Sequence, residues 1–179
     1  MQLRLDVEPM QYDNTASLYV VRHDTSDPTI VLRRRKPGGT FKPFGGTPQK
    51  TLAEDIWETA QKEMHRESDY MFSKLGLLQP KEAPNDLPHP LSISILGKPF
   101  KDHPDRHPDP VFAFTAESGS LHNAAVEEID AFTQSELRGL EVSDIELHVR
   151  IMGLAILQTC FPFWEEISAG EWRRAEEII

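Results

Sequence analysis

Two glutamates one helical turn apart, Glu63 and Glu67, are well suited by type and spacing to bind a metal ion. Their segment has helical periodicity, and on a helical wheel both project into the middle of an apolar arc of roughly 140°. The arc is formed by Leu52, Ala53, Ile56, Trp57, Ala60 and Met64. Carboxylates placed there repel each other, meet the negative end of the helix dipole and lose hydration.

A divalent cation such as Mg²⁺ would reverse these penalties, because it prefers oxygen ligands and two carboxylates can share it. The alternative is that the last turn of the helix leaves the core, so that Glu63 and Glu67 simply reach water and meet Arg66 or a distant basic residue. Helix geometry leaves both interpretations open.

The helix that carries these glutamates is predicted to begin at Thr51 and to end at about Glu67. Thr51 and Glu54 have the spacing of a capping box, which satisfies two unpaired backbone donors at a helix start. Polar residues fall outside the apolar arc, as a solvent-facing side requires: Asp55, Glu58, Gln61, Lys62 and His65.

A hairpin and a glycine-containing loop precede this helix. Residues 17–22 and 29–33 are β-prone and flank a polar turn, which predicts two paired strands. Gly45 and Gly46 would let the backbone of the following loop approach a ligand, because glycine tolerates conformations that a Cβ forbids. An ordinary flexible connection is the competing interpretation. Residues 33–36 form the densest basic run, which suits either phosphate binding or a solvated strand end.

Two further strands are predicted beyond the helix, at residues 91–96 and 111–115. A proline-rich loop should connect them over residues 97–110. His103 and His107 lie in this loop among aspartates, and we interpret them as solvated rather than as metal ligands, because prolines and acidic residues are typical of a surface loop.

The last third of the chain is predicted to be helical. Residues 143–146 repeat the capping-box pattern before a largely apolar segment that Phe161 and Pro162 should terminate. This segment is either buried inside the domain or part of a homodimer surface. A short final helix is expected at about residues 171–177.

Residues 45–69 resemble the Nudix box, G-x(5)-E-x(7)-R-E-U-x-E-E-x-G-U, in which U is a bulky aliphatic residue. The glycines, then Glu54, Lys62-Glu63-Met64 and Glu67, follow in the order of the motif. The resemblance extends in weaker form over residues 15–140, where Glu127 and Glu128 precede a segment similar to the family's acidic strand and "dEL".

The box is degenerate at four points. The spacing from Gly46 to Glu54 is two residues too long, and Ser68-Asp69 lacks the closing glycine. Lys62 replaces the arginine of the motif and cannot form a planar bidentate fork, so the loop that it would brace is less rigid. Arg66 replaces a glutamate, which removes one metal ligand and adds a cation near the metal.

The resemblance implies an α/β fold, a Nudix-like α/β/α sandwich with a mixed β-sheet and a C-terminal helical segment. It also implies hydrolysis of a diphosphate linkage in a nucleoside diphosphate joined to another group. The resemblance assigns Glu63 and Glu67 as ligands of Mg²⁺ or Mn²⁺, and Glu127 or Glu128 as an extra ligand or base. It places Gly45 and Gly46 beside the phosphates, and Arg33 or Arg35 in contact with the phosphates.

Arg66 lies on the rim of the apolar arc, where it could contact a substrate phosphate. The main alternative to an enzyme is a catalytically weak or inactive Nudix-fold module that binds or senses a nucleotide-like ligand. A purely structural interaction domain is a third hypothesis.

The composition limits partners and location. A formal net charge of -10 argues against a nucleic-acid polymer, because such binding requires many Lys and Arg side chains, but it permits a small phosphorylated substrate. The single cysteine, Cys160, excludes an internal disulfide and suits a reducing compartment. No secretion signal or membrane span is recognised. We therefore expect one domain over residues 1–179, located in the cytoplasm.

Overall fold

The computed structural model describes residues 16–34, 36–45, 56–68, 70, 74–81, 92–96, 107–116 and 128–168. Its strands are β1 (Ser17–Arg22), β2 (Thr29–Arg34), β3 (Phe44–Gly45), β4 (Leu75–Gln79), β5 (Ser92–Leu96), β6 (His107–Ala116), β7 (Glu128–Thr133) and β8 (Glu165–Ser168). Its helices are α1 (Ile56–Glu67), α2 (Gln134–Gly139), α3 (Leu147–Ala155) and α4 (Phe161–Phe163), with a π-helical segment, Ile156–Cys160, between the last two.

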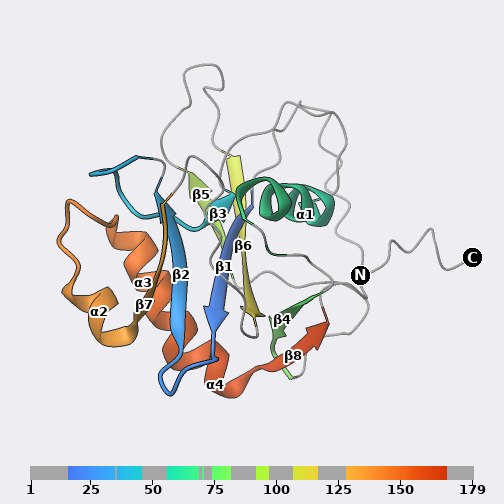
Figure 1. Ribbon diagram of the computed structural model, residues 1–179. Coiled ribbons are helices and arrows are strands. Elements are labelled where there is room, and N and C mark those ends of the chain that lie inside the picture. The colour runs from blue at the N-terminus through green and yellow to red at the C-terminus, as the bar shows by residue number, and fades with distance from the viewer. Residues whose placement is uncertain are drawn as a thin grey trace, which may run out of the picture.

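The strands form one mixed sheet in the order β7-β2-β1-β6-β4-β8, with β3 paired to β1 and β5 paired to β6 (Figure 1). The predicted hairpin is confirmed, because β1 and β2 pair antiparallel with Val20 opposite Val31. The neighbouring pair, β1 and β6, is parallel, which makes the sheet mixed. This mixed sheet, together with the helices on both of its faces described next, confirms the predicted α/β/α sandwich.

Helices cover both faces of the sheet, as the alternation of side chains along β1 requires. Leu18 and Val20 join a core with Ala60 and Met64 of α1. Tyr19 belongs to a second core, which contains residues of α3 and the π-helical segment such as Val149 and Ile156. Figure 1 shows α1 and α3 separated by the strands. The predicted core positions Ala60 and Met64 are confirmed as buried.

The predicted end of the glutamate-bearing helix is confirmed, because α1 ends at Glu67. Ser68 follows the last residue of this helix. Its backbone N–H and its hydroxyl both donate to the Met64 carbonyl, at 3.0 and 2.7 Å. The predicted helix start, with Thr51 and Glu54, lies outside the described residues, as does the predicted final helix.

The expected loop over residues 97–110 is wrong at its end, because β6 already begins at His107. Its first part, with Pro108 and Pro110, pairs with β5, whereas β1 joins β6 only from Val111 onward. A proline that lacks an N–H is tolerated in a strand where one side has no partner to bond. The rest of the predicted loop, including His103, lies outside the described residues.

The capping box predicted at residues 143–146 is also wrong. Helix α3 begins at Leu147, and its N-cap, Glu146, makes no side-chain capping bond. Tertiary contacts hold the preceding residues in a non-helical conformation: Phe41 donates its N–H to the Asp144 carbonyl at 2.7 Å, and Ile145 pairs with Phe41. The capping box of this region belongs to α2, where Thr133 and Glu136 bond reciprocally.

The helical path continues one residue beyond the predicted stop at Phe161 and Pro162, to Phe163. A proline inside a helix clashes with the carbonyl four residues earlier, and the wider turn of the π-helical segment before Pro162 accommodates this constraint. The outer face of α3 exposes Leu147 and Ile151. A homodimer through this face stays a prediction. No described helix is long and apolar enough to span a membrane.

Candidate active site

Glu63 and Glu67 lie together on the face of α1 that packs toward the sheet, as the helical wheel predicted. Each side chain is only 4% exposed. The alternative is therefore wrong in expecting both carboxylates to reach water, but the contacts that it expected with Arg66 and with a distant basic residue, here Arg33, are present. Two buried carboxylates require compensating positive charge or hydrogen-bond donors, because desolvation of an unpaired charge is costly.

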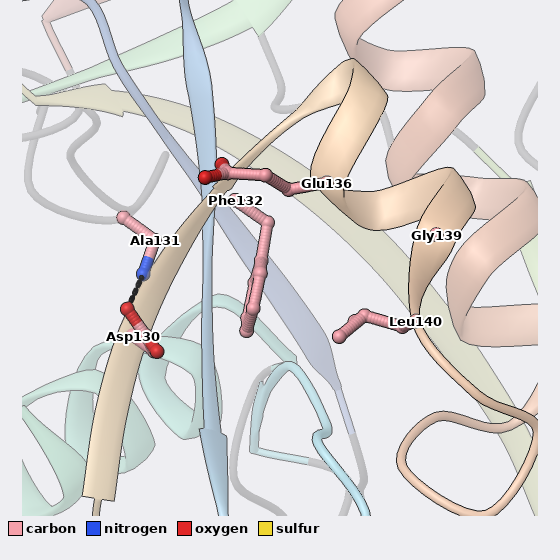
Figure 2. A pocket seen from close by; sticks show the side chains of 6 residues that line it. All are labelled: Asp130, Ala131, Phe132, Glu136, Gly139 and Leu140. Atoms are coloured by element: carbon pink, nitrogen blue, oxygen red, sulfur yellow. Dashed lines mark hydrogen bonds between the residues drawn. The ribbon is translucent and has the colours of Figure 1, made fainter.

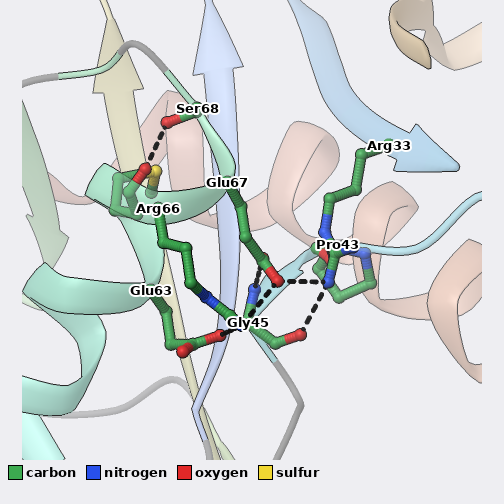
Figure 3. Close-up of polar contacts among 8 residues, drawn as sticks. Arg33, Pro43, Gly45, Glu63, Arg66, Glu67 and Ser68 are labelled. Atoms are coloured by element: carbon green, nitrogen blue, oxygen red, sulfur yellow. Dashed lines mark hydrogen bonds and ion pairs between the residues drawn. The ribbon is translucent and has the colours of Figure 1, made fainter. Parts of the chain in front are cut away.

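The backbone of Gly45 supplies one of these donors. Its N–H donates to Glu67 Oε2 at 2.5 Å, which joins the end of β3 to the end of α1 (Figure 3). Gly45 has a φ of 75°, and a Cβ at this position would lie 2.0 Å from the Ala16 carbonyl oxygen. Only glycine fits this close approach. The loop before α1 is therefore fixed at Gly45 by both its neighbours and a carboxylate.

Arg33 of β2 is the second partner of Glu67. Its Nη2 lies 2.9 Å from Glu67 Oε1 and donates to the Gly45 carbonyl at 2.9 Å, while its Nε donates to the Pro43 carbonyl at 3.2 Å. The Arg33 side chain is buried, so the planar guanidinium ties the loop at residues 43–45 to the last turn of α1. Lys62, to which the resemblance to the Nudix box assigned a bracing role, is exposed.

Arg66 supplies a second guanidinium, from α1, the helix that also carries Glu63 and Glu67. A single nitrogen, Nη2, lies 2.6 Å from Glu63 Oε2 and 3.1 Å from Glu67 Oε1, so it bridges the two carboxylates. Figure 3 shows the side chain folded back along α1 toward both acids. The Arg66 side chain is 52% exposed, which separates it from the buried groups that it contacts.

Among the described residues, the cluster contains two carboxylates and two guanidiniums, and these four groups are together formally neutral. Burial raises the pKa of Glu67 to about 7, although the Arg33 guanidinium and the Gly45 N–H both lower it. Near neutral pH, a proton therefore competes with any cation for this carboxylate.

The cluster fits a divalent cation on one condition. Buried carboxylate oxygens are the ligands that Mg²⁺ and Mn²⁺ prefer. A cationic nitrogen already lies within hydrogen-bonding distance of both acids, so the space between them accommodates positive charge. A metal ion that shares Glu63 and Glu67 must displace Arg66 from this position. Among the described residues, no group of three or more His, Cys, Asp or Glu side chains could hold a metal.

The structure does not bring Glu128 to this cluster. Glu128 lies opposite Arg34 in the β2–β7 pair and accepts two hydrogen bonds from it, at 2.7 and 2.6 Å. Arg34 also lies 4.7 Å from the centre of the Phe41 ring, which belongs to the core on the α3 side. Because neighbouring residues of a strand point to opposite faces, Arg33 and Arg34 serve different sides of the sheet.

Three predicted site residues, Arg35, Gly46 and Glu127, lie outside the described residues. The bracing role of Arg33 and the carbonyl of Pro43 are features that sequence reasoning missed. One signal for Arg33 was available: it shares strand parity with Val31, a core residue on the α1 side. That parity argues for a buried arginine rather than one in contact with substrate.

A pocket of about 400 Å³ lies elsewhere, on β7 and α2 (Figure 2). Its lining includes Phe132, Leu140, Asp130 and Glu136. Phe132 belongs to the core on the α3 side, so the pocket and the glutamate cluster lie on different faces of the sheet. The acidic lining is also unsuited to a phosphorylated ligand, because like charges repel.

Comparison with known proteins identifies the fold. No protein-family model matches the chain, and no curated protein matches its sequence significantly. A NUDIX-family hydrolase from Clostridium perfringens is similar in structure, with a TM-score of 0.64, 17% identity, and coverage of 83% of this chain and 97% of that chain.

Two of the other similar solved structures with TM-scores above 0.5 come from further bacteria. A protein from Jonesia denitrificans, described as a possible asymmetric diadenosine tetraphosphate hydrolase, has a TM-score of 0.54, 12% identity, and coverage of 89% of this chain and 96% of that chain. The NUDIX domain of Shewanella oneidensis NrtR, solved in complex with ADP ribose, has a TM-score of 0.51, 11% identity, and coverage of 84% and 92%. These similarities define the class: the chain has the Nudix fold.

Proposed function

We propose that this domain hydrolyses a diphosphate linkage in a nucleoside diphosphate joined to another group, with Mg²⁺ or Mn²⁺ held by Glu63 and Glu67. The observation that carries the proposal is the buried pair of carboxylates bridged by a single cationic nitrogen. A carboxylate pair that requires a cation, on the helix that resembles the Nudix box, suits metal-assisted phosphate chemistry.

When bound, the metal would neutralise charge on the phosphates and make a water molecule more acidic. The chain's own groups orient the reaction. Arg33 and Glu67 fix the Gly45 loop relative to α1, so the backbone beside the phosphates is already positioned before substrate binds. The exposed part of Arg66 suits contact with a substrate phosphate, since a guanidinium matches phosphate oxygens. Arg33 is buried in the bracing network, so we do not assign it to the substrate.

A second candidate function is binding of a nucleotide-like ligand without turnover. Arg66 favours it, because this residue neutralises both carboxylates where the Nudix box has a glutamate. The domain would then bind a phosphorylated ligand through Arg66 and the loop at Gly45.

We also propose that residues 1–179 form one domain that acts in the cytoplasm on a small molecule. The net charge of -10 is unfavourable for a nucleic-acid polymer, and a buried, unpaired Cys160 is compatible with a reducing compartment.

Hydrolysis assays with ADP-ribose and diadenosine tetraphosphate, in Mg²⁺, Mn²⁺ or EDTA, test the proposed function. They are run at pH 8, above the pKa of Glu67, so that protons compete little with metal. We expect turnover only with metal, and a loss of kcat/KM of about a hundredfold or more in Glu63→Gln, as when several kcal/mol of charge stabilisation is removed. Glu63→Gln leaves the contacts of Arg33 and Gly45 with Glu67 in place.

The double variant His103→Ala/His107→Ala is the control, because neither histidine belongs to the proposed site. It should keep the full metal dependence. Ligand-induced stabilisation without turnover in any metal would favour the second candidate function. Neither turnover nor stabilisation would contradict both.

A further inference from the structure

We infer that Arg66 is an exchangeable internal cation, so that a divalent metal ion and the Arg66 guanidinium compete for the same two carboxylates. The inference rests on the proposed metal site, and it adds a property of that site: metal binding releases a guanidinium at the surface beside the metal. Metal occupancy and the position of Arg66 would therefore be coupled.

The contacts of Arg66 support exchange at the level of geometry. One nitrogen, Nη2, serves both Glu63 Oε2 and Glu67 Oε1, at 2.6 and 3.1 Å. A cation that took this point would satisfy the same two oxygens. Both carboxylates are held on α1 and are buried, so the acids stay in place when the guanidinium leaves.

The exposed fraction of the side chain distinguishes Arg66, which moves when metal binds, from Arg33, which stays in place. The Arg66 side chain is 52% exposed, whereas the Arg33 side chain is buried and bonded to two loop carbonyls as well as to Glu67. Rotation of Arg66 into water costs little solvation, because an exposed arginine is already hydrated. Arg33 has no comparable route to solvent, so it stays with Glu67 while Arg66 exchanges.

Charge explains why exchange is needed rather than simple addition. With both arginines in place the cluster is formally neutral, so an added divalent ion would meet two cations as well as two anions. Withdrawal of Arg66 leaves one net negative charge for the metal and places a guanidinium where the incoming phosphates carry negative charge. Substrate would therefore favour the metal-bound arrangement.

The test compares the parent protein with Arg66→Ala in Mn²⁺ titration calorimetry and in thermal melts with EDTA or with Mn²⁺. Without its internal competitor, Arg66→Ala should bind Mn²⁺ about tenfold to a hundredfold more tightly, the range expected for loss of one charge-assisted hydrogen bond. The same variant should melt at a lower temperature than the parent in EDTA, and this difference should shrink or reverse in saturating Mn²⁺.

Arg22→Ala is the matched control, because Arg22 also pairs with a carboxylate, Asp24, but outside the cluster. Its effect on the melting temperature should be equal in EDTA and in Mn²⁺. If Arg66→Ala does not fold, Arg66→Gln keeps a hydrogen-bond donor without the charge. Side-chain NMR of the parent gives an independent measurement: Mg²⁺ should shift the Arg66 guanidinium signals and leave those of Arg22 unchanged.

Equal or weaker Mn²⁺ binding by both Arg66 variants, or an Arg66 signal that ignores Mg²⁺, would overturn the inference while the proposed metal site stands. Absence of Mn²⁺ binding in the parent and in every variant would overturn the metal site as well, and the two failures are thereby distinguished.

Discussion

Replacement of Arg33 by methionine is expected to destabilise the protein by about 3 to 5 kcal/mol, because it leaves a buried carboxylate without its guanidinium partner. Methionine fills similar volume, so the loss reports on charge and hydrogen bonding rather than on a cavity. Glu67 would lose its ion pair, and the carbonyls of Pro43 and Gly45 would lose their donors. Urea denaturation monitored by tryptophan fluorescence and by circular dichroism measures the change in the free energy of unfolding.

Arg34→Met is the matched control for this prediction. Arg34 is the next residue of the same strand, and it pairs with Glu128, whose side chain is 42% exposed. An ion pair open to solvent contributes little to stability, so the loss for Arg34→Met should be much smaller, even with the contact of Arg34 with the Phe41 ring. A loss for Arg33→Met no larger than that for Arg34→Met would contradict the bracing role of Arg33.

The second large effect is expected from Arg66→Glu, which places a carboxylate where the Nudix box has one. Three acids would then share the buried cluster with Arg33 as the partner on the sheet side. The variant should be less stable than the parent in EDTA and should gain more stability from Mn²⁺, because metal binds only the folded state. Its kcat/KM on a nucleoside diphosphate substrate should nevertheless fall by about tenfold to a hundredfold, since a charged hydrogen bond to phosphate of roughly 1.5 to 3 kcal/mol is lost.

Steady-state kinetics at saturating Mn²⁺ distinguishes two roles of Arg66: contact with a substrate phosphate, or mere replacement of a metal ligand. A higher kcat/KM in Arg66→Glu would mean that Arg66 merely replaced a useful metal ligand. Arg66→Lys serves as the control, because it keeps the charge but not the planar fork, and it should retain part of the activity.

Local patterns in the sequence predicted the parts of the fold that depend on periodicity. The β1–β2 hairpin, the end of α1 at Glu67 and the direction of Glu63 and Glu67 toward the sheet follow from strand alternation and from the helical wheel, whereas the wheel left the burial of the two acids open. These features depend on neighbours within one element, so a single sequence contains the information that they require.

Features that depend on tertiary contacts were not predictable in the same way. In the described part of the chain, capping-box patterns occur at residues 133–136 and 143–146. The first forms a capping box, whereas contacts with Phe41 hold the second in a non-helical conformation. Arg66 was correctly expected on the rim of the apolar arc. A helical wheel describes directions from the axis, however, and does not show that a long side chain folds back onto both carboxylates.

The role of Arg33 required knowledge of which face of the sheet α1 covers and of how the loop returns. The backbone of Arg33 pairs with Lys42, which brings the carbonyls of Pro43 and Gly45 beside its guanidinium. Such a non-local pairing is absent from any local motif. Arg33 therefore fits neither interpretation of residues 33–36, a phosphate-binding run or a solvated strand end. It is a buried structural arginine, and the next residue, Arg34, is less buried.

The central claim is that Glu63 and Glu67 share a divalent cation, and anomalous diffraction from a crystal grown with Mn²⁺ at pH 8 tests it most directly. We predict one strong anomalous peak between the two carboxylates, coordinated by an oxygen of each, with the Arg66 guanidinium withdrawn from its present position. Well-ordered density that keeps Arg66 Nη2 bonded to both carboxylates at saturating Mn²⁺, with no anomalous peak beside them, would contradict the account.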